Sequence, residues 1–206
     1  TKNSTIQVGA QINHKLDKFL SGTNQLTAGI EYQYDDILDE ILSYNYKIDQ
    51  TTKNIGLFVQ SDWEAFRGFN LLLGARADKH NMVDKIIINP RVSALYKIGK
   101  ETQIRASWAS GFRAPQAFDT DMHIAFAGGG ISRIRLAEGL KPERSNSYSL
   151  SVNYDKAQEL YIWGFTLEGF YTNLNKAFAL EEVGSDEFGD IFEKRKEYPV
   201  GLAYET

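Results

Sequence analysis

The chain is dominated by stretches in which apolar and polar residues alternate. In the clearest stretch, Tyr148, Leu150, Val152 and Tyr154 alternate with serine and asparagine over residues 147–154. Successive side chains of a β-strand point to opposite faces, so each stretch predicts a strand with one apolar and one polar face. Comparable stretches lie at 6–13, 26–35, 54–64, 70–80, 90–98, 102–110 and 164–174, and a weaker one begins near Tyr198. The pattern predicts an all-β, antiparallel fold.

The links between these stretches alternate in length. The short links are centred on 21–24, 66–69, 99–102 and 155–161, and the long links cover 36–52, 80–89, 112–142 and 176–197. Helical spacing is found only from Asp35 to Leu42, where a short helix could form. In an up-and-down meander all the long links lie at one end, as in outer-membrane barrels with short turns on one side and long loops on the other. The links therefore favour part of a large transmembrane β-barrel over a sandwich with Greek-key connections.

Aromatic residues are numerous, with 11 Tyr, 12 Phe and 3 Trp. The following lie near the predicted strand ends: Tyr32, Tyr34, Trp63, Trp108, Tyr154, Tyr161, Trp163 and Tyr171. A ring with one polar atom suits the lipid–water interface, so these residues predict the aromatic girdles of a membrane barrel. The alternative is the general preference of Tyr and Trp for strands.

Composition excludes several classes of protein. The net charge of -4 is too small and of the wrong sign for nucleic-acid binding. The absence of cysteine excludes disulfides, thiolate metal sites and a cysteine nucleophile. The sequence has no apolar run of about 18 residues and no apolar leader at its start. Barrel strands remain compatible with this low hydropathy, because only alternate residues face lipid.

Two short motifs resemble the TonB-dependent outer-membrane receptors. The first motif is Gly111-Phe112-Arg113-Ala114-Pro115, and the second is Leu140-Lys141-Pro142-Glu143. In that family the first motif ends a barrel strand, an outer loop follows, and the second motif opens the next strand. The resemblance implies that residues 1–206 are a partial barrel domain from a barrel of about 22 strands in the bacterial outer membrane, without its plug domain and remaining strands.

The resemblance also implies the partners of the complete protein. It would bind a scarce nutrient such as a siderophore, haem or cobalamin, contact outer-membrane lipid, and connect through its plug to an energy-coupling complex in the inner membrane. The resemblance implies neither a bound cofactor nor an enzymatic activity.

The loop between the two motifs contains the candidate ligand residues. They are Asp119, Asp121, His123, Arg133 and Arg135, next to a flexible run of three glycines. Some haem receptors of the family carry a histidine between these motifs, and imidazole binds haem iron. However, residues 137–140 read Ala-Glu-Gly-Leu where those receptors have Asn-Pro-Asn-Leu, which favours a solvated or hydrogen-bonded histidine.

The remaining candidates in this loop also have two interpretations. The two arginines alternate with Ile134 and Leu136, as in a loop hairpin above the membrane, and could bind carboxylates or phosphates. Contact with lipopolysaccharide or solvent is the alternative. The two aspartates have a spacing that calcium could use, but the other positions of an EF-type loop are absent.

Three classes of function therefore remain at this stage. The first is an uptake receptor, the second a soluble β-sandwich that binds carbohydrate or mediates adhesion, and the third an outer-membrane barrel hydrolase. The sequence has no Gly-x-Ser-x-Gly elbow, no His-Glu-x-x-His motif and no phosphate-binding loop that ends in Gly-Lys-Ser/Thr. The uptake receptor is the interpretation that the strands, links and motifs favour together.

Overall fold

The computed structural model describes residues 2–41, 46–115, 133–137, 139–186 and 189–196, and every regular element among them is a strand. The strands are β1 Lys2–Phe19, β2 Gly22–Ile41, β3 Tyr46–Phe66, β4 Phe69–His80, β5 Ile87–Ile98, β6 Thr102–Arg113, β7 Arg133–Leu136, β8 Glu143–Ala157, β9 Ile162–Asn175, β10 Phe178–Asp186 and β11 Gly189–Lys196. No helix that could span a membrane occurs in the described residues.

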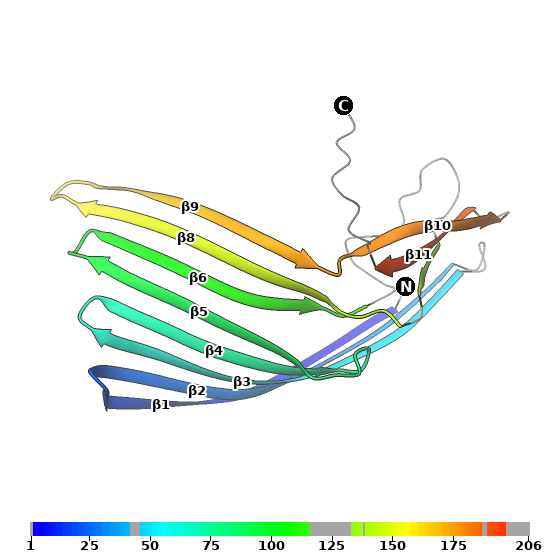
Figure 1. Ribbon diagram of the computed structural model, residues 1–206, viewed down its shortest axis with the longest axis horizontal. Helices are drawn as coiled ribbons and strands as arrows, with labels where there is room; N and C mark the ends of the chain where they lie inside the picture. The colour runs from blue at the N-terminus through cyan, green and yellow to red at the C-terminus, as the bar shows by residue number, and fades with distance from the viewer. Residues whose placement is uncertain (1, 42–45, 116–132, 138, 187–188, 197–206) are drawn as a thin grey trace.

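Eight of the strands form one curved antiparallel sheet in the order β1-β2-β3-β4-β5-β6-β8-β9 (Figure 1). Each strand pairs with its sequence neighbour, apart from the insertion of β7 between β6 and β8. This is the predicted up-and-down meander. The two outer strands, β1 and β9, each have one neighbour in the sheet.

The register keeps polar and small residues together on one face across the whole sheet. One row crosses all eight strands and consists of Asn13, Thr27, Gln60, Gly74, Arg91, Ala109, Ser147 and Thr172. The next row on the opposite face contains Leu73, Val92, Trp108, Tyr148 and Tyr171. A one-residue slip in any pair would exchange the two faces, so the alternation fixes the register.

The apolar face lies open along the sheet. Leu150 is 55% exposed, Leu57 is 55% exposed and Leu167 is 68% exposed. No second sheet covers this face in the described part of the chain, because the three-stranded sheet of β10, β11 and β7 lies beyond the loop end (Figure 1). The sandwich alternative is therefore not supported, since it requires a second sheet packed on the apolar face.

Aromatic side chains form two groups on the sheet. At the short-turn end, the ring centroids of Phe66 and Phe69 are 5.0 Å apart and those of Tyr154 and Trp163 are 5.2 Å apart. The second group contains Tyr148 and Tyr171, whose centroids are 6.4 Å apart. Tyr148 and Tyr154 lie on the same strand and face, separated by about 20 Å along the strand. This spacing resembles that of two interfacial girdles.

The links lie at the predicted ends of the sheet, but two of the expected long links differ from the prediction. The expected link 176–197 contains the strands β10 and β11. The links at the short-turn end are residues 20–21, 67–68, 99–101 and 158–161. At the other end, residues 36–52 were expected to be a loop, with a helix from Asp35. Instead β2 continues to Ile41 and β3 begins at Tyr46. The Asp36 carboxylate accepts a 2.7 Å hydrogen bond from the Thr51 hydroxyl and supports this extended pair. The weak strand expected near Tyr198 lies outside the described residues.

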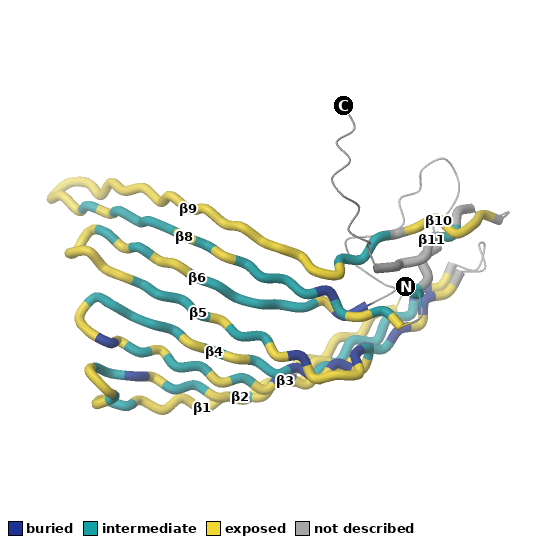
Figure 2. The backbone as a smooth tube through the Cα atoms, in the orientation of Figure 1, coloured by how far each residue is buried: buried dark blue, intermediate teal, exposed yellow. Residues whose placement is uncertain are grey.

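Buried positions concentrate toward the loop end of the sheet (Figure 2). The apolar cluster there contains Val83, Ile87 and Ala114, each at most 8% exposed, with Met82 and Phe112 packed against it. Hydrogen bonds hold the link 81–86, which contributes Val83 to this cluster. Asn81 bonds to the backbone of β3, and the Lys79 ammonium donates to the carbonyls of Val83 and Asp84 at 3.0 and 2.6 Å.

Candidate functional site

The candidate ligand loop is only partly described. Asp119, Asp121 and His123 lie outside the described residues. Arg133 and Arg135 lie on β7, where the structure describes the backbone only. Their assignment as ligand residues therefore stays a prediction.

The partner of β7 differs from the expected one. The alternation at 133–136 predicted a hairpin within its own loop, and it does form a strand. However, β7 pairs in parallel with β11, with Arg133 opposite Ile191 and Leu136 opposite Lys194. The hairpin at this end is formed by β10 and β11. Two separate loops thus contribute to one small sheet, which a search for local hairpins cannot detect.

The two family motifs meet at the loop end of the main sheet. Arg113 on β6 is opposite Glu143 on β8, and the closest charged atoms, Nη1 and Oε2, are 3.8 Å apart. The Glu143 residue is only 9% exposed. Its other carboxylate oxygen accepts a hydrogen bond from the backbone N–H of Phe178, the first residue of β10. Glu143 therefore connects β6, β8 and the start of the outer hairpin.

The remaining motif residues surround this junction. Phe112 packs against the apolar cluster and Ala114 belongs to it, while Pro115 follows directly and is buried. On the other side, Leu140, Lys141 and Pro142 border a hollow next to β5. The structure thus places both motifs where a strand leaves the sheet for a loop.

A network of charged and polar groups crosses the polar face of the sheet. The Arg76 guanidinium on β4 donates to Glu31 on β2 at 2.6 Å and to Asp78 at 2.8 Å. Asp78 is 1% exposed and also accepts hydrogen bonds from Asn54 at 2.9 Å and Asn89 at 3.3 Å. A buried carboxylate needs this many donors to offset its loss of hydration.

Glycines on this face provide space for the long side chains. A Cβ on Gly56 would lie 2.1 Å from the Arg76 guanidinium, and a Cβ on Gly29 would lie 2.5 Å from the Phe58 ring. Arg76 can therefore cross β3 toward Glu31 because position 56 has no side chain. The sequence showed the charges and glycines but not their register, so sequence reasoning missed this network.

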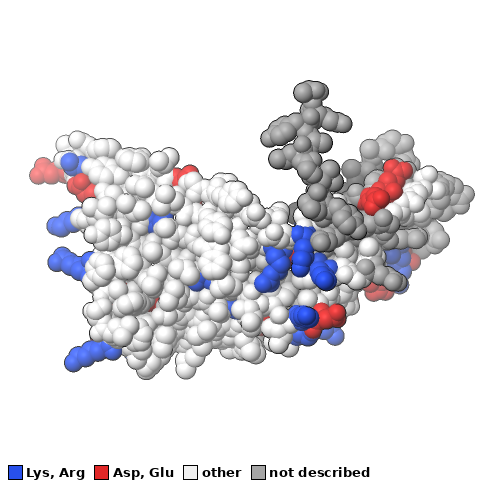
Figure 3. All heavy atoms as spheres, in the orientation of Figure 1, with Lys and Arg blue, Asp and Glu red and all other residues white. Residues whose placement is uncertain are grey.

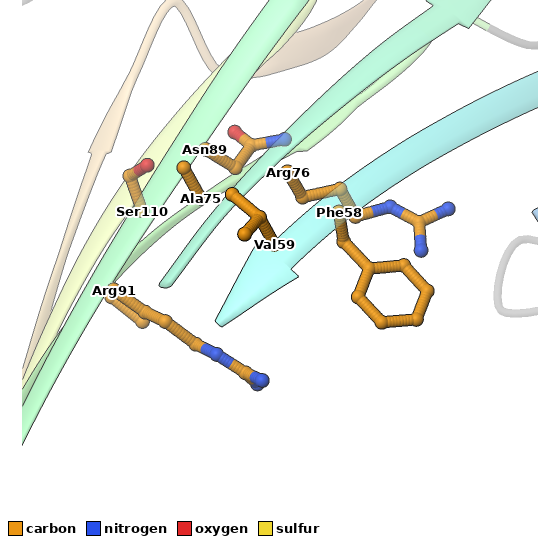
Figure 4. Close-up of a pocket in the computed structure, with 8 residues that line it drawn as sticks. Phe58, Val59, Ala75, Arg76, Asn89, Arg91 and Ser110 are labelled. Carbon is orange, nitrogen blue, oxygen red and sulfur yellow. The ribbon is translucent and has the colours of Figure 1, made fainter. Parts of the chain in front are cut away.

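A hollow of about 390 Å³ lies beside the network (Figure 4). Its lining includes the Phe58 ring and the side chains of Arg76, Asn89 and Arg91. The Arg91 guanidinium donates to the neutral amide oxygen of Gln60. Because Arg91 keeps further N–H donors, this hollow suits an acceptor-rich or anionic surface.

A second hollow of about 240 Å³ lies nearer the loop end. It is lined by Gln33, Asp35, Thr52, Asn54, His80, Phe112, Arg113 and Ala114. The Nδ1 atom of His80 accepts the backbone N–H of Met82 at 3.1 Å, so the neutral ring carries its proton on Nε2. No group of three or more potential metal ligands of the His, Cys, Asp and Glu types occurs in the described ranges.

The chain was compared with known proteins. A sequence model described as "TonB dependent receptor-like, beta-barrel" matches residues 1–193. No curated protein matches the chain. Among solved structures, the siderophore receptor PirA from Pseudomonas aeruginosa superposes with a TM-score of 0.75 at 17% identity, over 95% of this chain and 37% of that receptor.

Two further structures show the same fold. The ferric enterobactin receptor PfeA from Pseudomonas aeruginosa, in a mutant form bound to enterobactin, gives a TM-score of 0.67 at 18% identity, over 94% of this chain and 32% of that one. The FrpB iron transporter from Neisseria meningitidis gives a TM-score of 0.61 at 19% identity. The match covers 94% of this chain and 31% of that transporter. The chain thus spans about a third of each of these proteins. On the match over residues 1–193, the chain belongs to the TonB-dependent receptor-like β-barrel family, a family of transport receptors.

Proposed function

We propose that this chain forms part of the wall of a bacterial outer-membrane receptor that takes up an iron chelate with energy from the inner membrane. The observation that carries the proposal is the eight-stranded meander with one open apolar face and one polar face crossed by a charged network. Lipid covers the apolar face, and a wet, plugged lumen meets the polar face.

The similar structures support iron as the transported element. They are named as receptors for siderophores or ferric enterobactin, or as an iron transporter. Haem and cobalamin are the competing nutrients for this family. An iron chelate with several anionic oxygens would suit the arginines of β7 and the loop that precedes them.

Ligand recognition is assigned to residues 116–141 and especially to Asp119, Asp121, His123, Arg133 and Arg135. The argument is positional, because this link joins the two motifs at the loop end, where β7 also joins β11. The hollow lined by His80 and Arg113 lies toward the same end and would receive the ligand next.

Uptake measurements test this proposal. The complete receptor would be expressed in a bacterium that lacks its own iron-chelate receptors. We expect accumulation of radioactive iron supplied as a catecholate or hydroxamate chelate, and loss of accumulation but not of binding when an uncoupler removes the proton gradient. Uptake of cobalamin alone, or uptake unaffected by the uncoupler, would contradict the proposal.

Loop variants test the residue assignment. The double change Arg133→Gln and Arg135→Gln should weaken binding of the chelate about tenfold or more, because each arginine supplies charge-assisted hydrogen bonds. His123→Ala tests a haem or metal role separately. The control is Lys100→Gln, which removes a positive charge from a turn at the opposite end. Equal affinities for the double variant and the control would remove the arginines from the site.

A further inference from the structure

A hollow of about 380 Å³ lies at the border between the apolar face and the loop end. Its apolar part includes Val83 and Ile87 of the buried cluster, together with Ile86 and Ile88, which are 64% and 59% exposed. Ile88 pairs with Ala77 on β4, and Ala77 lies on the same outward face of β4 as Leu73. The hollow is therefore continuous with the surface that meets lipid in the proposed barrel.

Positive charge surrounds this hollow. The lining contains Lys85, Lys141, Arg144 and Lys176, with Asp84 as its acidic residue. Figure 3 shows Lys and Arg side chains gathered where the broad uncharged surface gives way to the loop end. In the part of the chain that the structure describes, the three lysines have no carboxylate within ion-pair distance.

One of these cations is held in place by hydrogen bonds of its own side chain, and another lies on an anchored link. The Arg144 guanidinium donates to the carbonyl of Ile88 at 3.0 Å and to Asn89 at 3.4 Å, which fixes it against β5 and leaves other N–H groups free. Lys85 lies on the link that Lys79 and Asn81 anchor. Four cations and the exposed isoleucines thus line the same hollow.

We propose that this hollow binds a phosphorylated lipid of the outer leaflet, with its phosphates between the lysines and Arg144 and its acyl chains along Ile86 and Ile88. Phosphate oxygens are good acceptors for guanidinium and ammonium groups. A free phosphate would gain nothing from the apolar part of the lining, whereas a lipid would contact the apolar and the cationic side chains at once. This inference rests on the proposed membrane barrel and is independent of which nutrient is transported.

Lipid binding by the complete purified receptor tests the inference. The probe is diphosphoryl lipid A in phosphatidylcholine nanodiscs, and its retention would be measured by native mass spectrometry. The combined change Lys85→Gln, Lys141→Gln and Lys176→Gln should weaken retention at least about tenfold, because each basic residue contributes to attraction of anionic lipid. The matched control removes the same number of cations from the short-turn end, by Lys18→Gln, Arg67→Gln and Lys100→Gln, and should retain the lipid.

Further measurements distinguish failure of the lipid site from failure of the proposed function. Monophosphoryl lipid A should bind more weakly than the diphosphoryl form, and inorganic phosphate should compete poorly. Equal retention by both triple variants, or full displacement by inorganic phosphate, would overturn the lipid site. If the receptor transports no iron chelate but its lipid retention still depends on the three lysines, the proposed function fails and the lipid site stands.

Discussion

At the residue scale, the best-defined feature is the Arg76 guanidinium between two carboxylates from different strands. Glu31 and Arg76 are 45 positions apart in the sequence, so only the register brings them together. Asp78 is the more buried of the two acids, with its side chain 2% exposed against 27% for Glu31. The guanidinium is therefore more important for Asp78, which cannot regain hydration if its partner is lost.

Replacement of Arg76 should destabilise the barrel. Arg76→Met should lower the free energy of unfolding by about 3 kcal/mol, because it leaves the Asp78 carboxylate buried without its cation. The matched control is Arg105→Met on the same face, where the arginine is exposed and should cost under about 0.5 kcal/mol. Urea unfolding of the complete receptor in lipid vesicles measures both. Similar costs for the two variants would show that the network adds nothing to stability.

An arginine introduced on β8 should lower the free energy of unfolding far more on the apolar face than on the polar face. Leu150 pairs with Ala106 and Gly169 on the apolar face, while Ser149 pairs with Ser107 on the polar face. Leu150→Arg should destabilise the barrel by about 2–4 kcal/mol if it lies near the bilayer midplane. Ser149→Arg should cost far less, since its side chain meets water. Reversible unfolding in lipid measures both variants. Equal losses of unfolding free energy would mean that the two residues are assigned to the wrong faces.

At the element scale, the sequence predicted the eight strands of the main sheet, their order and the end of the sheet at which each link lies, but not the strands β10 and β11 inside the expected link 176–197. Alternation was sufficient because each strand separates an apolar face from a polar one. It failed from Asp35 onward, where acidic residues and isoleucines have helical spacing. There β2 continues to Ile41 and pairs with β3, and the hydrogen bond between Thr51 and Asp36 joins the two strands.

The candidate site was less predictable than the sheet. The motifs correctly marked strand ends, but the spatial role of Glu143 depends on Phe178, which lies 35 positions later. The pairing of β7 with β11 is equally non-local. Sequence spacing carries no information about such contacts between loops.

The Glu143 contact should restrain the start of β10. Glu143→Ala removes the acceptor for the Phe178 N–H, so exchange of that amide should accelerate about tenfold. Glu143→Gln keeps an acceptor oxygen and should preserve most of the protection while losing the ionic contact with Arg113. Hydrogen exchange read by mass spectrometry on a peptide covering 176–180 distinguishes the variants. Peptides from β4 and β5 serve as internal controls and should not change; unaltered exchange at Phe178 in both variants would exclude the restraint.

At the scale of the whole molecule, the two outer strands of the sheet, β1 and β9, have no second neighbour among the described strands. All residues of β9 are exposed, and β1 is exposed at nearly every position, whereas β4, β5, β6 and β8 are mostly half-buried. Phe170 on β9 is 83% exposed even though it lies on the polar face. Such edges pair with further strands in a closed barrel, and the similar structures are about three times as long as this chain.

These edges predict how the 206-residue chain should behave when it is produced alone. Unpaired N–H and C=O groups along β1 and β9 offer templates for other copies, and the open apolar face requires detergent. We therefore expect self-association in detergent micelles, measured by light scattering after size exclusion, with an oligomer distribution that shifts with protein concentration. In the proposed receptor, further strands would close these edges, and that protein should elute as one species under the same conditions. A monodisperse monomer of the isolated chain in buffer without detergent would mean that its apolar face and its strand edges are covered, and it would contradict this prediction.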